Sequence, residues 1–598
     1  MKLPRKTMMA ASLCAIGLAA TGQSALAASA NDNNTTTPIK HVIVVIGENH
    51  SFDNLFATYT PASGQSMLNL LSQGIVTSSG SAGANVGRAR QNQASNTSSY
   101  TLNPTRTGSY GSNLPEVDFL GPVYDARYDN LVWKGWDPTI QGPANGPFQI
   151  TKWDVSYSTP LSVTGSPVHR FFQMYQQTGG TNAALDMYTW VPTQTGAGNG
   201  TSYLTFSTTA SRTMQGSEEM GFFNMASGDA PYLKSLAQQY AISDNFHQSV
   251  MGGTGANFYA ISTGGQLPVY NVNGTLATPP ANQIENPNPA AGTNNFFTQD
   301  GYSGGSYVNC SDTNQPGVAP IASLLASEGR ATKCQPGAYY LVNNYNLPYS
   351  STGAVQPLGA TTYTFPPQTQ QTVADLLTNH SVSWKWYTGG RDANDFISTY
   401  FPGVLEDVLQ LLVYNNLGDP LVANQRVMTG PMANNLQSLK HFYSDIQSNT
   451  LPAVSFVIPP GLESGHPGAS APVFYESFLS TLVNAVQSNS AVWEDTAIII
   501  TSDEGGGYFD TAPIQQLDFF GDGPRIATIV VSPYAKQGHV DHAYSDHSSI
   551  LKFIEKNWSL PPITATTRDA LPNPVQVGNS YLPTNSPAIG DMSGLFQF

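Results

Sequence analysis

The stretch TAIIITSDEGGGYFD, residues 496–510, joins an apolar, β-branched run to two adjacent carboxylates and three glycines. A strand that only fills a core normally closes on an ordinary turn, so this ending needs another explanation. Asp503 and Glu504, followed by a backbone that glycine makes flexible, are typical of a place where a ligand binds. The apolar run itself is typical of a strand covered on both faces, as in a parallel sheet.

Similar runs recur along the chain and alternate with helical patterns. Apolar, β-branched runs occur at 41–47, 451–459 and 525–533. Apolar residues at the three- and four-residue spacing of amphipathic helices occur in 230–241, 372–380, 475–489 and 548–558. Strands that alternate with helices predict an α/β fold.

Long stretches rich in Gly, Ser, Asn and Thr separate these elements, at about 60–115, 192–215 and 265–370. They are too long for simple connections. We expect them to be surface insertions or a small β-rich subdomain.

Composition narrows the class of protein. The chain has 598 residues, of which 40% are hydrophobic, so it can bury a large core. Its net charge of −15 argues against capture of nucleic acid, and no basic patch is present for an anionic membrane surface. We therefore expect neither a nucleic-acid partner nor a stable membrane anchor.

The N-terminus resembles a signal peptide. Residues 1–27 combine a basic start, a short Ala-rich apolar region and a small-residue cleavage site, and a polar linker follows at 28–38. The alternative, a membrane anchor, is disfavoured because the apolar run is short. We expect a secreted or periplasmic protein, in which Cys310 and Cys334 form a disulfide in an oxidising compartment.

Acidic and amide side chains follow two of the predicted strands. Glu48 and Asn49 come directly after 41–47, and Asp503 and Glu504 follow the run 496–501. In open α/β sheets, ligands bind beyond the carboxyl ends of the strands, so the two corners can meet there. Grouped carboxylates repel each other unless a cation neutralises them, which favours a divalent metal. Either pair taken alone could equally be a solvated turn or a helix N-cap.

A nucleophile for such a site is available in MGGTGAN, residues 251–257. Thr254 lies between glycines, which would let a substrate approach closely, and metal coordination would activate its hydroxyl. Asn257 could donate a hydrogen bond to an anionic oxygen. The alternative is that GGTG is only a turn.

The chain has ten histidines, and two of them are candidates for contacts with an anionic substrate. His466 follows the run 451–459, and His169 lies in SPVHRFFQ. Near the C-terminus, Asp546 could cap the helix at 548–558 while His547 only positions it.

Five motifs together resemble a bacterial secreted phosphoesterase family that contains phospholipases C and acid phosphatases. They are IKHVIVVIGENHSFDNLFATY, MGGTGAN, ESGHPG, TSDEGGGYFD and PRIATIVVSPYAKQGHVDHAYSDHSSILKFIEKNW. The resemblance implies an alkaline-phosphatase-like α/β fold, with a central, mostly parallel sheet flanked by helices and with long insertions. It also implies that residues 39–598 form a single catalytic domain.

The resemblance further assigns roles to the candidate residues. It implies that Glu48, Asn49, Asp503 and Glu504 hold one divalent metal, with Thr254 as nucleophile and further ligand. His466, and His169 in the acid phosphatase branch, would contact the phosphoryl group. That branch also has histidines after SWKWYTGG, whereas this chain continues RDANDFISTYFPG, so we expect Lys385 or Tyr387 to replace that contact.

The expected activity is hydrolysis of a phosphate ester or phospholipid through a phosphothreonine. All-oxygen ligands favour Ca²⁺, Mg²⁺ or Mn²⁺ and leave Zn²⁺ or iron open. Two alternatives remain open: a metal-free Ser/Thr esterase using a His547–Asp546 pair, and an inactive binding protein on the same scaffold. The sequence leaves substrate and oligomeric state open.

Overall fold

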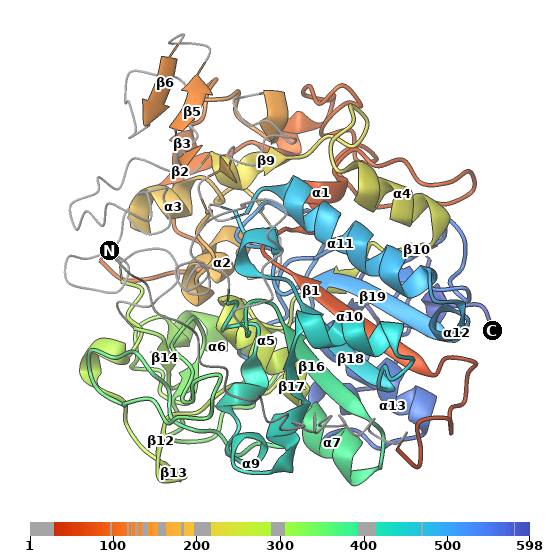
Figure 1. Cartoon of the computed structure of the whole chain (residues 1–598). Helices are drawn as coiled ribbons and strands as arrows, with labels where there is room; N and C mark the ends of the chain where they lie inside the picture. The colour runs from red at the N-terminus through yellow and green to blue at the C-terminus, as the bar shows by residue number, and fades with distance from the viewer. Residues whose placement is uncertain are drawn as a thin grey trace, which may run out of the picture.

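A computed structural model gives the fold around an 8-stranded sheet with the strand order β17-β16-β18-β1-β19-β20-β10-β21 (Figure 1). It describes residues 29–598 except 96–97, 116–118, 121, 126–129, 134–141, 153–162, 165, 181–183, 196–216, 289–304, 393–413, 468–469 and 579. The expected signal peptide at 1–27 therefore lies outside the described residues, as does most of the expected insertion at 192–215.

The sheet is mostly parallel, as expected. Every pairing from β17 to β19 is parallel, and so is that of β10 with β21. β20 is antiparallel to both of its neighbours. The strands are β1 (His41–Gly47), β10 (Ala241–Ser243), β16 (Trp384–Thr388), β17 (Leu436–Ser438), β18 (Val454–Ile458), β19 (Thr496–Ser502), β20 (Thr528–Val531) and β21 (Val540–Asp541).

Helices cover both faces of this sheet, which explains why its central strands are apolar throughout. In β1, Ile43 and Val45 join one hydrophobic core, whereas Val42, Val44 and Ile46 join the core on the opposite face. The first core is closed by α4 (Pro231–Gln239), α10 (Leu439–Gln447) and α11 (Pro472–Gln487). The second is closed by α5 (Thr254–Thr263), α7 (Val373–Asn379) and α13 (His547–Trp558).

The predicted elements are confirmed, with one difference of direction. The strand predicted at 41–47 has those bounds, and all four predicted helices are present. β20 runs antiparallel because the connection from Ser502 to Thr528 holds no helix that could carry the chain back across the sheet. An apolar run carries no information about strand direction, so the sequence could not reveal this.

The insertions form short ladders beside the main sheet. Within 60–115, β2 (Asn92–Ala94) pairs with β3 (Arg106–Ser109). Within the described part of 265–370, β12 (Asn271–Val272) pairs with β13 (Thr275–Leu276), and β14 (Tyr307–Val308) pairs with β15 (Tyr340–Leu341). Their small size agrees with the expected β-rich insertions.

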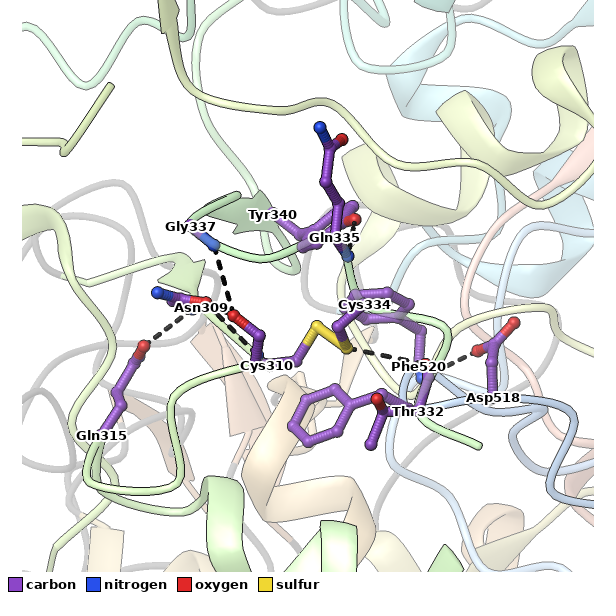
Figure 2. Close-up of a disulfide and its surroundings, with 12 residues drawn as sticks. Asn309, Cys310, Gln315, Thr332, Cys334, Gln335, Gly337, Tyr340, Asp518 and Phe520 are labelled. Carbon is purple, nitrogen blue, oxygen red and sulfur yellow. Dashed lines mark hydrogen bonds between the residues drawn. A yellow bond between two sulfur atoms is a disulfide. The ribbon is translucent and has the colours of Figure 1, made fainter. Parts of the chain in front are cut away.

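The expected disulfide is confirmed, with 2.02 Å between the sulfurs of Cys310 and Cys334 (Figure 2). It closes more than a surface loop, because the enclosed segment contains α6 (Val318–Ser327) and Cys310 is buried in a third hydrophobic core with Ile321 and Leu325. Among the described residues, no helix combines the length and the apolar character needed to cross a bilayer.

Candidate active site

The two acidic corners predicted from the sequence lie side by side. β1 and β19 are parallel neighbours, and their register pairs Gly47 with Ser502, the residues directly before the two corners. The N–H groups of Asn49 and Glu504 donate to Oδ1 of Asp503, at 3.2 and 2.7 Å. The parallel pairing thus brings together side chains that are 454 residues apart in the sequence.

The glycines of DEGGG let this corner pack tightly. Gly506 and Gly507 have φ of +60° and +79°, a conformation that favours glycine. A Cβ at Gly506 would lie 2.6 Å from the backbone oxygen of Asn49, and one at Gly507 would lie 2.1 Å from that of Val168. The loop therefore lies directly against the first acidic corner and against the segment that carries His169.

Thr254 is the first residue of α5 and points at the acidic corner. Its hydroxyl donates to Oε1 of Glu504 at 3.1 Å, and only 2% of the residue is exposed. The preceding turn needs glycine, because a Cβ at Gly252 would lie 1.9 Å from the backbone oxygen of Val342. Oδ1 of Asn344 accepts from the N–H of Gly255 at 2.7 Å and holds the start of the helix in place.

His169 lies near Glu504, and the ring of His466 lies beside that of His169. Nδ1 of His169 lies 2.6 Å from the backbone oxygen of Pro167, and Nδ1 of His466 lies 2.7 Å from that of Pro467. A carbonyl oxygen only accepts, so each Nδ1 carries a hydrogen and Nε2 is the nitrogen that each ring offers to the site. Nε2 of His169 lies 4.0 Å from Oε1 of Glu504, and the two rings are 6.0 Å apart.

The corner concentrates negative charge in a buried place. Burial, together with the charges of Glu504 and Glu48, raises the pKa of Asp503 well above its usual range. In the described part of the chain, Oδ2 of Asp503 and Oδ1 of Asn49 are buried without a hydrogen-bond partner. Buried oxygens of this kind are normally paired or bound to a metal, so the residues fit a cation.

In the described part of the chain, side chains of His, Cys, Asp and Glu do not form a metal site by themselves. Among the described residues, no three or more of them are grouped so that they could hold a metal ion. The predicted ligand set also needs two donors of other types, the amide oxygen of Asn49 and the hydroxyl of Thr254. The metal therefore stays a prediction.

Sequence reasoning missed two residues that support the corner. Nδ2 of Asn415 donates to Oε1 of Glu48, and Nε2 of His50 lies 2.9 Å from the backbone oxygen of Gly465, next to His466. Burial lowers the pKa of His50 to about 4, so its ring is neutral at pH 7. Asn415 belongs to none of the motifs that the sequence analysis singled out, so the sequence held no signal for it.

Three predicted substrate contacts are corrected. Asn257 uses its amide on the backbone: Oδ1 accepts from Val250, and Nδ2 donates to Val250 and Gly252. It therefore shapes the turn before Thr254.

Lys385 and Tyr387 share the face of β16 that packs on α10, and both bind Oδ2 of Asp445 there, at 2.5 and 2.6 Å. Alternation along the strand directs these two side chains to that helix, so they do not replace the missing histidines.

The His547–Asp546 pair is structural, which counts against the metal-free alternative. Asp546 caps α13 by accepting from the N–H of Ser548, as expected. Nε2 of His547 lies 2.9 Å from the backbone oxygen of Ser502, and its Nδ1 accepts from the N–H of Ser249. Both nitrogens are thus engaged by the backbone.

A model of the Phosphoesterase family matches residues 39–561. The chain belongs to the Phosphoesterase family. The match begins just before β1 and ends just after α13, so it includes both acidic corners and Thr254.

Curated members resemble parts of the chain. A non-hemolytic phospholipase C of Burkholderia pseudomallei is 30% identical over 270 residues, covering 37% of this chain and 38% of that protein. Phospholipase C B of Mycobacterium tuberculosis is 31% identical over 182 residues, which are 26% of this chain and 32% of that protein. A probable acid phosphatase of Kluyveromyces lactis is 24% identical over 213 residues, covering 34% and 45% respectively. The matches thus span less than half of each relative's length.

Among solved structures, a protein in the alkaline phosphatase superfamily from Vibrio parahaemolyticus matches at 12% identity with a TM-score of 0.24. The match covers 55% of this chain and 59% of that one. Similarity at this level supports no structural comparison. The expected α/β architecture is confirmed by the order and direction of the strands themselves.

Proposed function

We propose that this member of the Phosphoesterase family hydrolyses phosphoric esters with Thr254 as nucleophile. The main support is the hydrogen bond from Thr254 Oγ1 to Glu504 Oε1, which places a buried hydroxyl at the start of α5 beside the acidic corner. The N-terminus of a helix favours an anion, because its N–H groups and its dipole carry partial positive charge.

Glu48, Asn49, Thr254, Asp503 and Glu504 would hold one divalent cation. When bound, such an ion would lower the pKa of a hydroxyl and neutralise charge on the phosphoryl oxygens. The buried oxygens of Asn49 and Asp503 that have no partner among the described residues support this assignment.

The protein's own groups would carry the displacement. Oγ1 of Thr254 would attack phosphorus in line and form a phosphothreonine, while Glu504 Oε1, which already accepts the hydrogen bond, would hold the hydroxyl proton. His466 or His169, in its imidazolium form, would donate its Nε2 proton to the departing oxygen and regain a proton from the attacking water in the second step. Water would then release the phosphoryl group and restore the threonine.

The relatives' names leave two substrate classes, phospholipids and small phosphomonoesters. We place the enzyme outside the cytoplasm, which the Cys310–Cys334 bond supports because such bonds persist in oxidising compartments.

Thr254 provides the test of this function. Turnover of a chromogenic phosphate monoester and of a phospholipid should fall at least about 10³-fold in Thr254→Ala and in Asp503→Ala. Thr254→Ser, which keeps the hydroxyl, should retain measurable turnover, and a chelator should remove activity that added divalent metal restores. Wild-type rates in Thr254→Ala would disprove the mechanism. Release of diacylglycerol would identify a phospholipase, and release of inorganic phosphate alone would identify a phosphatase.

A further inference from the structure

A second group of polar side chains lies at the edge of the sheet, apart from the acidic corner. Asp244 follows β10, and His542 follows the neighbouring parallel strand β21. Ser66 comes from the insertion at 60–115. Nδ1 of His542 lies 2.6 Å from Oδ1 of Asp244, and Oγ of Ser66 lies 3.3 Å from Nε2 of His542.

The hydrogen bonds define the proton positions in this group. A carboxylate only accepts, so Nδ1 of His542 carries a hydrogen, and in the neutral ring Nε2 accepts from the hydroxyl of Ser66. Activated hydroxyl nucleophiles use this order of serine, histidine and carboxylate. The hydrogen bond with Asp244 also raises the pKa of His542, which makes the ring a stronger base.

The carboxylate is held rigidly, whereas the other two groups face solvent. Asp244 is fully buried, and its Oδ2 also accepts from the N–H of Leu68 at 2.8 Å and from the hydroxyl of Tyr581 at 2.6 Å. The side chain of His542 is 39% exposed, and Ser66 is exposed. A base fixed by a buried carboxylate and open on its other side is accessible to a ligand.

Gln65, the residue before Ser66, lines a cavity of about 570 Å³ together with Tyr534, Lys536 and His539, among others. Oε1 of Gln65 accepts from the N–H of Val540 at 3.0 Å, so the amide nitrogen is the group that Gln65 can offer to a carbonyl oxygen. The lining is polar and partly cationic, which suits a small polar acyl group better than a long alkyl chain.

We propose that Ser66, His542 and Asp244 form a second hydrolytic site, which cleaves small polar carboxylic esters. Oγ of Ser66 attacks the carbonyl carbon while Nε2 of His542 takes the hydroxyl proton. The C–O bond to the alcohol breaks, and the alcohol leaves with that proton. Water, deprotonated by His542, then attacks the acyl-serine, releases the carboxylic acid and returns the proton to Ser66. This site does not depend on the phosphoesterase proposal.

The test uses the full chain carrying Thr254→Ala, so that the first site cannot contribute a nucleophile. In this background p-nitrophenyl acetate should give a burst of nitrophenol, and peptide mapping after an acid quench should find the acetyl group on Ser66. Adding Ser66→Ala should abolish the adduct and lower the rate at least tenfold, and adding His542→Gln should lower it similarly. Ser79→Ala, an exposed serine in the same insertion, should change neither.

Two results would overturn the proposal. The first is an unchanged rate of hydrolysis in the protein with Ser66→Ala, together with no acetyl group on Ser66 in the Thr254→Ala protein. In that case Ser66, His542 and Asp244 would only hold the insertion against the sheet. The other is an adduct on Ser66 that forms equally fast in the His542→Gln protein, which would mean that the histidine does not activate the serine. Equal denaturation midpoints of the variants would show that the comparison is made on folded protein.

Discussion

At the scale of single residues, the acidic corner depends on hydrogen-bond partners that lie outside the sequence motifs. Asn415 is buried, and its amide donates to Glu48, one of the expected metal ligands. A group that orients a ligand carboxylate influences the site without touching the substrate. Such partners typically contribute about 10–100-fold to metal affinity or activity.

If the proposed function holds, Asn415→Ala should lower turnover of phosphoric esters about 10–100-fold and raise the divalent-metal concentration needed for half-maximal activity. Steady-state rates measured across a metal titration would show both effects. Asn434→Ala, an exposed asparagine, serves as the matched control. An unchanged metal requirement in Asn415→Ala would show that Glu48 needs no such support.

A second residue-scale prediction concerns His247, which is fully buried between Asn245 and Gly523. Burial lowers its pKa from 6.5 to about 3. Below pH 6.5 the unfolded chain therefore binds a proton at His247, whereas the folded protein does not. Because of this difference, the free energy of unfolding has its full value above pH 6.5 and decreases as the pH falls below it. At pH 5 the loss should reach about 2 kcal/mol.

Denaturant titrations at pH 7.5 and pH 5 would measure this loss. His247→Gln lacks the titrating group, so its free energy of unfolding should fall about 2 kcal/mol less between the two pH values than that of the wild type. Identical pH dependence in the two proteins would contradict the assignment, whatever the variant's absolute stability.

At the scale of elements, the candidate site lies where the ends of β1 and β19 meet. The glycine loop after β19 can lie against Asn49 and Val168 only because it has no side chains there. This explains Gly506 and Gly507, which allow close packing between segments.

Gly507→Ala should destabilise the protein by about 2–5 kcal/mol, since it combines a left-handed backbone with a clash against Val168. Chemical denaturation would measure the loss, and turnover should fall with it because His169 follows Val168. Gly87→Ala is the control, because nothing lies within 4 Å of its Cβ position. Equal stability of Gly507→Ala and Gly87→Ala would mean that the glycine loop can move away from Val168 at no cost in stability.

Many of the helices and strands could be predicted from the sequence alone. Long apolar runs and amphipathic periods predicted β1, β19 and the main helices, because covering both faces of a parallel sheet imposes that pattern. The direction of β20 was not predictable, since it depends on what connects it to β19.

The site itself was predictable only in part. Two predicted strands are each followed by a pair of candidate residues, Glu48 and Asn49 after β1 and Asp503 and Glu504 after β19. Because β1 and β19 are parallel neighbours, the two pairs lie close together. Lys385 and Tyr387 were expected from the family resemblance, as replacements for histidines of the acid phosphatase branch, but they lie within β16 and face α10. No motif indicated Asn415.

At the scale of the whole molecule, the disulfide closes a segment within the insertion at 265–370, and its Cys310 is buried in the third hydrophobic core. The disulfide spans 24 residues, and closing a loop of this size contributes about 3 kcal/mol, mainly by restricting the unfolded chain.

The double variant Cys310→Ser, Cys334→Ser should therefore lose about 3 kcal/mol of stability and keep its turnover at low temperature. Wild-type protein unfolded in a reductant should show the same loss. If the double variant were as stable as the oxidised wild type, the disulfide would contribute no free energy of unfolding beyond that of the hydrophobic core around Cys310.

The central position of β1 also bears on how the molecule is made. Its partner corner is 454 residues further along the chain, which at ribosomal speed means a delay of roughly 20–90 s. Until Asp503 and Glu504 have been synthesised, no truncated or nascent form can assemble both halves of the acidic corner. Any chemistry that needs both halves of the acidic corner is therefore expected only after synthesis has passed Glu504.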